Sequence, residues 1–213
     1  MPDFDALQRV WLMDWFGHVL NYDADRKDLR RQFLTPCEYP DLFMISSWPV
    51  QTPSRVMLRR TSSIPQGLPE AQFVEAGKHI VGLQTQGAAG TFLSINPSNE
   101  DTHWYAGYLL DWERFIPLTK PMMDAFSIFI DGSFAELKIN GKPVSGLTWP
   151  DVAHNIGNYF WLGEHKVALS RNLEKLAEIG EIPPGKSVDV LLLSPESDQI
   201  KLTVTRSDVP LED

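Results

Sequence analysis

Proline spacing is the feature that most constrains the fold of this chain. Six of the 16 prolines lie between residues 36 and 69, and the segments between them are short and rich in β-branched and aromatic residues. Proline lacks a backbone N–H and interrupts both helix interiors and central strands, so this stretch cannot hold a long helix. The pattern therefore predicts short strands at 42–47 and 55–60.

Turn pairs and alternation predict further strands in the rest of the chain. An Asp-Gly pair at 131–132 and an Asn-Gly pair at 140–141 are typical of tight hairpin turns. Apolar and polar residues alternate between them, which predicts that Leu137 and Ile139 are buried on one face. The predicted strands are 79–85, 91–95, 104–110, 126–130, 134–139, 142–144, 159–163, 187–193 and 199–205.

Apolar residues at spacings of three and four predict three helices. The first spans 4–20, and the second spans 26–35 and is ended by Pro36. The third spans 165–180, with Gly180 at its C-terminal end. Two of these helices lie at the start of the chain, so we expect a helical N-terminal segment.

Together these elements predict a single domain over 1–213. It would consist of a helical segment at 1–35, a β-rich body at 36–164, the helix at 165–180 and a C-terminal hairpin at 187–205. Strands and helices do not alternate, which favours an α+β class over a doubly wound sheet. We expect mainly antiparallel β structure, either a curved sheet or a barrel-like sandwich, with the N-terminal segment and the late helix packed on it.

Charge and composition limit the partners of the chain. The formal net charge is −9 and the pI is near 5.0, which disfavours binding to nucleic acid or anionic membranes. No apolar run approaches the roughly 18 residues of a membrane span. The acidic start, Met1–Asp5, lacks the basic region of a secretory signal, and Cys37 is alone, so no internal disulfide forms. We expect a cytoplasmic protein without a metal or cofactor.

A basic segment interrupts this acidic background. Between residues 26 and 60 there are seven basic residues and only three acidic ones. If the predicted helix at 26–35 packs beside the strand at 55–60, Arg30, Arg31, Arg55 and Arg59 converge on one patch. Such a patch would either bind an acidic partner or pair internally with an acidic segment such as 211–213, and we favour internal pairing.

One group of residues could support acid–base chemistry. His103 lies near Asp111 and Glu113 in the sequence, and a histidine beside a carboxylate is a common general acid or base. Cys37 follows a predicted helix C-terminus, where the dipole disfavours a thiolate, so it is a poor nucleophile candidate. Nucleotide-binding and nucleophile-elbow motifs are absent from the sequence.

Tryptophan residues either fill the core or, where they are exposed, bind proteins or sugars, and we favour burial for most of them. The chain holds seven Trp residues, of which Trp104 and Trp112 are candidate contact residues. In addition, residues 129–143 resemble the hairpin of laminin-G and concanavalin-like sandwiches, in which an Asp-Gly turn precedes a strand that ends in Asn-Gly-Lys. The resemblance covers 15 residues and implies a carbohydrate-binding β-sandwich as one alternative.

The leading hypothesis is a non-catalytic soluble interaction protein that recognises a protein partner. An inhibitor, an immunity-type protein or an assembly factor would fit the modest size, the acidic surface and the missing catalytic motifs. An acidic surface steers association with a basic partner. The alternatives are the carbohydrate-binding module and a small hydrolase-like enzyme that uses His103, Asp111 and Glu113.

Overall fold

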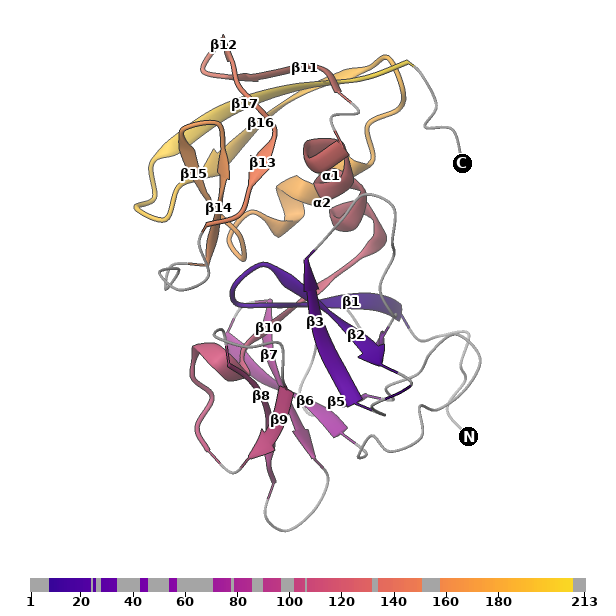
Figure 1. Cartoon of the computed structure of the whole chain (residues 1–213). Helices are drawn as coiled ribbons and strands as arrows, with labels where there is room; N and C mark the ends of the chain where they lie inside the picture. Colours follow the sequence, from indigo (N-terminus) through magenta and orange to yellow (C-terminus); the bar gives the residue numbers. More distant parts are fainter. Residues whose placement is uncertain are drawn as a thin grey trace. The chain divides into compact units, whose positions relative to one another are not determined.

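Two compact units make up the chain (Figure 1). The N-terminal unit comprises Met1–Leu34 and Glu38–Leu118, and the C-terminal unit comprises Thr35–Cys37 and Thr119–Asp213. The expectation of a single domain remains a prediction. The computed structural model describes residues 8–23, 25, 28–33, 43–45, 54–56, 71–77, 79–85, 90–96, 102–105, 107–131, 134–150 and 158–208.

In the N-terminal unit, the described strands form one antiparallel sheet. Its main path runs β3-β2-β1-β10-β7-β6-β5, β4 also pairs with β1, and a branch of β8 and β9 extends from β7. The strands are β1 Gln8–Asp14, β2 His18–Asp23, β3 Asp28–Phe33, β4 Phe43–Ile45, β5 Ser54–Val56, β6 Ala71–Gly77, β7 Ile80–Thr85, β8 Phe92–Ile95, β9 Thr102–Tyr105 and β10 Phe115–Leu118.

This sheet bends until it nearly closes into a barrel, as the lower part of Figure 1 shows. The branch returns β9 to β3, where the Thr102 hydroxyl donates a hydrogen bond to the Leu29 carbonyl at 2.6 Å. Burial of apolar side chains inside the barrel drives the closure. The core comprises Val10, Leu12, Leu20, Leu29, Val81, Leu83, Leu93, Ile95 and Phe115, and Trp104 packs against it.

The helix predicted at 4–20 is wrong, because residues 8–23 form the hairpin of β1 and β2. Val10 and Leu12 belong to the barrel core, while Trp11 and Met13 on the other face of β1 are also buried. A strand covered on both faces has a continuous apolar run, which periodicity cannot distinguish from a helix segment. At the turn, Gly17 takes a positive φ of 91° that glycine tolerates.

The helix predicted at 26–35 is wrong as well. Residues 28–33 form β3, which pairs with β2 over six residue pairs. The prediction depended on Leu29 and Phe33, which are four residues apart, and a spacing of four fits the period of a strand as well as that of a helix. The described residues of the predicted N-terminal helical segment therefore form strands and the turns between them.

Several predicted strands of this unit are confirmed. β4, β7 and β8 lie within the predicted ranges 42–47, 79–85 and 91–95. β5 overlaps only the start of the range predicted at 55–60, and the remainder of that range lies outside the described residues. β9 covers the start of the range predicted at 104–110, but residues 107–110 have no strand structure.

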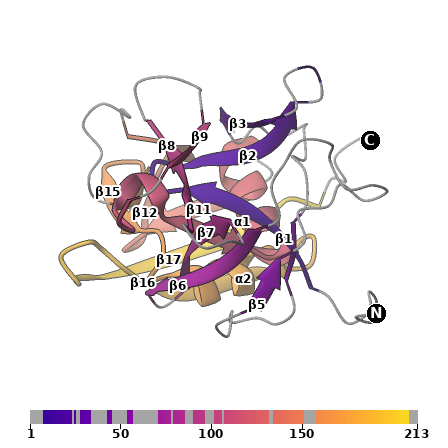
Figure 2. The same cartoon turned by 90° about the horizontal axis from the view of Figure 1, so that it is seen from below.

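The C-terminal unit places two helices against two small antiparallel sheets (Figures 1 and 2). The larger sheet has the order β12-β11-β17-β16, and the smaller one β13-β14-β15. The elements are α1 Lys120–Asp131, β11 Phe134–Ile139, β12 Lys142–Pro143, β13 Leu147–Thr148, β14 Tyr159–Leu162, β15 His165–Ala168, α2 Leu173–Gly180, β16 Ser187–Leu193 and β17 Gln199–Arg206.

The strand predicted at 126–130 is wrong, because this run lies inside α1. Phe126 and Phe129 are buried three positions apart on the helix and contact the ring of Phe160. Pro121 occupies the first turn of α1, where proline favours helix initiation. The predicted three-stranded meander is therefore incorrect, and the resemblance to a sandwich hairpin loses its first strand.

The second half of that prediction is confirmed. β11 spans Phe134–Ile139, and Leu137 and Ile139 are buried. Asn140 and Gly141 have φ values of 50° and 80°, as a two-residue hairpin turn requires, and they connect β11 to β12. The other neighbour of β11 is β17 rather than the range 126–130.

The late helix is shorter than predicted, and the C-terminal hairpin is confirmed. The range 165–180 begins with β15, and only Leu173–Gly180 is helical. A Cβ at Gly180 would collide with the carbonyl oxygen of Pro121, so glycine permits the close approach of α2 to α1. β16 and β17 cover the predicted strands 187–193 and 199–205.

Candidate functional site

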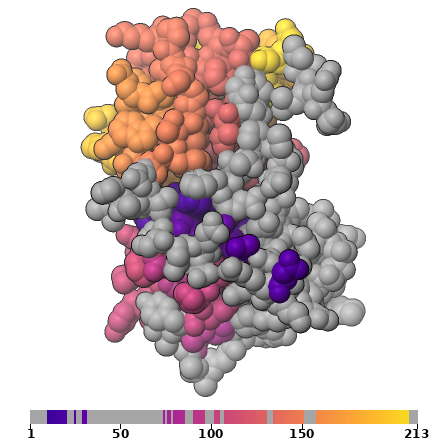
Figure 3. Space-filling view, in the orientation of Figure 1, coloured from indigo at the N-terminus to yellow at the C-terminus, as the bar shows by residue number. Residues whose placement is uncertain are grey.

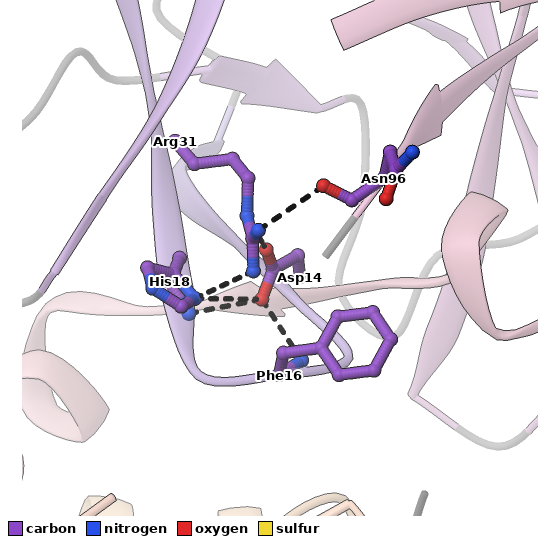
Figure 4. A network of polar contacts seen from close by, with 5 residues as sticks. All are labelled: Asp14, Phe16, His18, Arg31 and Asn96. Atoms are coloured by element: carbon purple, nitrogen blue, oxygen red, sulfur yellow. Dashed lines mark hydrogen bonds and ion pairs between the residues drawn. The ribbon is translucent and has the colours of Figure 1, made fainter. Parts of the chain in front are cut away.

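A buried ionic network lies at the turn between β1 and β2 (Figure 4). Asp14 ends β1 and is 1% exposed. Its Oδ1 accepts hydrogen bonds from the backbone N–H groups of Phe16 and His18, both at 2.9 Å, and its Oδ2 accepts one from Arg31 Nε at 2.7 Å. These three donors satisfy both oxygens of the Asp14 side chain, which offsets the cost of burying it.

Arg31 extends the network to two other parts of the barrel. One terminal nitrogen lies 2.8 Å from His18 Nδ1, and the other donates to the Asn96 carbonyl at 3.3 Å. A guanidinium can only donate, so His18 Nδ1 must accept and a neutral His18 carries its proton on Nε2. The guanidinium carbon also lies 5.8 Å from the centre of the Phe16 ring.

The geometry of this network suits a structural role, in which it holds three segments of the barrel together. Arg31 connects β3 to the end of β1 and to the residue that follows β8, three segments that the barrel must bring together. Removal of one member of a buried pair leaves an uncompensated charge, which gives the network a strong preference for one arrangement. Within the described residues, no cluster of three or more His, Cys, Asp or Glu side chains could hold a metal ion.

The structure does not bring the described arginines of the predicted patch together on one face. Arg31 is buried and pairs with Asp14, whereas Arg30 is half-buried on the opposite face of β3. Arg55 lies in β5, at the opposite end of the sheet path from β3. Arg59 and the acidic segment 211–213 lie outside the described residues. Internal pairing thus occurs at Arg31, through an aspartate that sequence reasoning did not assign to it.

Glu113 anchors a second notable segment. It lies in the short 3₁₀ helix Asp111–Glu113 and is 1% exposed. Its Oε1 accepts a hydrogen bond from Ser94 Oγ at 2.6 Å, and its Oε2 accepts one from the Leu110 N–H at 3.0 Å. Leu109 lies so close to Gly82 of β7 that a Cβ there would collide with it. These contacts of Leu109, Leu110 and Glu113 therefore fix residues 108–112 to the barrel.

Three large apolar side chains on this same segment face solvent. Tyr108, Leu110 and Trp112 are 84%, 60% and 45% exposed. We call these three residues the 108–112 ledge. Among the described residues, only Leu191 is a further exposed large hydrophobic side chain. In Figure 3 the pink segment around residue 110 lies on the surface of the N-terminal unit.

The predicted acid–base group is only partly assembled. His103 is exposed on β9 directly opposite Ser94, which bonds to Glu113, so His103 and Glu113 lie on one side of the β8–β9 pair. Asp111 instead forms an ion pair with Arg114 at 3.0 Å. Both oxygens of Glu113 already accept internal hydrogen bonds, which suits an anchoring role better than proton transfer.

The two tryptophan candidates differ in their surroundings. Trp112 belongs to the exposed ledge, whereas Trp104 packs against the barrel core. Sequence reasoning missed Tyr108 and Leu110, because the apolar run that contains them was assigned to a strand. A usable signal is the Asp-Trp-Glu segment at 111–113, whose two acidic residues end that apolar run.

Comparisons with known proteins give no relative for this arrangement. No family model matches the chain, and neither a curated protein nor a solved structure matches it. In the part of the chain that the structure describes, no helix is long and apolar enough to cross a membrane.

Proposed function

We propose that this chain is a non-catalytic interaction protein that binds a protein partner through the 108–112 ledge. An inhibitor, an immunity-type protein or an assembly factor would act in this way. The observation that carries the proposal is the exposure of Tyr108, Leu110 and Trp112 on a segment that is anchored by buried Glu113.

The physical chemistry of the ledge supports this role. Tyrosine and tryptophan are the residues most enriched at the energetic centres of protein interfaces. A segment that is already fixed loses little conformational freedom on binding, so more of the contact energy contributes to affinity. The net charge of −9 would accelerate association with a basic partner at low salt.

Affinity capture with matched variants tests the proposal. We expect Tyr108→Ala and Trp112→Ala to remove a reproducible partner from native host extract, with an unchanged thermal midpoint. Lys142→Ala is the control, because it truncates an exposed side chain of β12 that lies outside the ledge. Capture that survives both ledge substitutions, or that fails equally with Lys142→Ala, would contradict the proposal.

A second candidate function is carbohydrate binding, which one feature of the C-terminal unit favours. Tyr159 and Trp161 lie half-buried on the outer face of β14 with ring centres 5.8 Å apart. Lys166 Nζ lies 5.1 and 5.4 Å from the two ring centres and supplies hydrogen-bond donors. A glycan array probed with the protein and with Trp161→Ala tests this candidate, and equal signals from both proteins would eliminate it.

A further inference from the structure

Among the described strands of the C-terminal unit, β16 forms one edge of the larger sheet. The sheet order ends at β16, and its seven residues pair with β17 in an unbroken register from Ser187 with Thr205 to Leu193 with Gln199. An edge strand leaves half of its backbone hydrogen-bonding groups without a partner strand. Figure 1 shows β16 and β17 in yellow.

Two contacts reveal which backbone groups face away from β17. The Lys186 carbonyl accepts a hydrogen bond from the Arg206 N–H, so Lys186 faces β17. Alternation then turns the N–H and C=O groups of Ser187, Asp189 and Leu191 outward. Leu193 agrees with this pattern, because the Asn172 side chain bonds both its carbonyl (2.9 Å) and its N–H (2.8 Å) from outside the sheet.

This pattern disfavours two of the registers in which a second copy of the chain could pair with the edge, those centred on Asp189 and on Leu191. Antiparallel self-pairing that uses all three outward residues would place Ser187 opposite Leu191 and Asp189 opposite Asp189 of the other copy. Like charges directly opposite each other destabilise a sheet. A register centred on Leu191 would instead require the backbone of Leu193, which Asn172 already occupies.

The side chains on the outer face of this edge suit a strand from another protein. Leu191 is 53% exposed and offers apolar surface. Thr203 Oγ1 donates to one oxygen of Asp189 at 2.6 Å, and Lys201 Nζ lies 2.9 Å from the other. These contacts fix the carboxylate on the outer face of the sheet, and they hold the pKa of Asp189 below its usual value, first through the Thr203 hydrogen bond.

We propose that β16 accepts an extended segment of another protein as a fifth, antiparallel strand, with a basic residue opposite Asp189 and an apolar residue opposite Leu191. Backbone hydrogen bonds to Ser187, Asp189 and Leu191 would supply the affinity, and the two side chains would supply the selectivity. The negative net charge of the chain favours the same basic partner. This surface is separate from the 108–112 ledge and does not depend on it.

A short peptide tests the proposal on the full chain. The probe is fluorescein-labelled Val-Thr-Lys-Thr-Thr with an amidated end, and the matched peptide carries Glu in place of Lys. We expect the Lys peptide to bind about five-fold more tightly, from the usual strength of a cross-strand charge pair. It should also slow hydrogen exchange at the amides of Ser187, Asp189 and Leu191.

Two variants sharpen the test. Asp189→Lys should reverse the preference between the peptides. Leu191→Pro should abolish binding, because it removes an outward N–H and leaves the ladder with β17 intact. Circular dichroism reports whether Leu191→Pro folds, and Asp189→Lys decides the result if it does not. Trp112→Ala should bind both peptides as the unaltered chain does, which separates this proposal from the ledge.

Three outcomes would overturn the proposal. The first is that neither peptide binds at millimolar concentration. The second is equal affinity for the two peptides. The third is slower hydrogen exchange at the same three amides when the protein concentration is raised without peptide, together with a larger sedimentation coefficient. That result would mean that a second copy of the chain occupies the edge.

Discussion

The two units treat charge in opposite ways. Among the described residues, the buried ionisable side chains Asp14, His18, Arg31 and Glu113 all lie in the N-terminal unit. In the C-terminal unit the described ion pairs are at the surface, as between Lys175 and Glu178. A buried charge is costly without its partners and therefore specifies one arrangement, whereas an exposed pair contributes little. Buried charge thus adds specificity to the apolar core of the barrel, whereas the described part of the C-terminal unit relies on apolar packing without buried charge.

The largest expected effect comes from the buried network. Arg31→Met leaves Asp14 without its cation, and we expect a loss of about 3–5 kcal/mol in the free energy of unfolding, measured by urea denaturation. Lys175→Met is the control, because it removes one member of an exposed pair and should cost about 0.5 kcal/mol or less. Similar losses of unfolding free energy for both variants would mean that the buried pair of the N-terminal unit contributes no more than the exposed pair of the C-terminal unit.

The next effect tests apolar packing in the C-terminal unit. Leu137 is 3% exposed on β11, and we expect Leu137→Ala to lower the free energy of unfolding by about 2–5 kcal/mol. Glu136→Ala on the adjacent, outward position is the matched control. A loss below about 0.5 kcal/mol for Leu137→Ala, typical of a surface change, would show that this strand does not contribute to the core.

A smaller effect concerns the anchor of the ledge. Glu113→Gln keeps one acceptor for Ser94 but presents an N–H group to the Leu110 N–H, and we expect a loss of about 1–3 kcal/mol. Hydrogen exchange should accelerate at residues 108–112 and remain slow in β7. Unchanged exchange in the ledge would show that Glu113 does not fix it.

The smallest effect is a pH dependence at Asp189. Hydrogen bonds from Thr203 and Lys201 lower its folded-state pKa, so the folded chain binds this proton less readily than the unfolded chain. The resulting stabilisation is present above the unfolded pKa of about 4 and is lost as the pH falls through the folded pKa. Asp189→Asn should therefore flatten the acid side of the melting-temperature profile slightly. A profile that becomes steeper would contradict this sign.

Local patterns predicted only part of this molecule. The Asn-Gly turn at 140–141 and the alternation of β17 predicted their structures because both signals are local. β1 and α1 were misassigned for one shared reason, since continuous apolar runs fit a doubly covered strand and a buried helix equally well. Of the candidate site, the sequence analysis predicted Trp112 as a contact residue. It did not predict the pairing of Arg31 with Asp14, because that pairing depends on tertiary structure and has no signal in the local sequence.

The seam where β9 meets β3 has a kinetic consequence. Thr102 reaches Leu29 across 73 residues of chain, and Arg31 reaches Asn96 across 65. Joining such distant segments costs loop-closure entropy before any contact compensates for it, so contacts of this separation tend to form late in folding. A contact that is absent from the transition state governs how fast a protein unfolds and barely affects how fast it folds. The two side chains at the seam therefore determine mainly how long the closed barrel survives once it has formed.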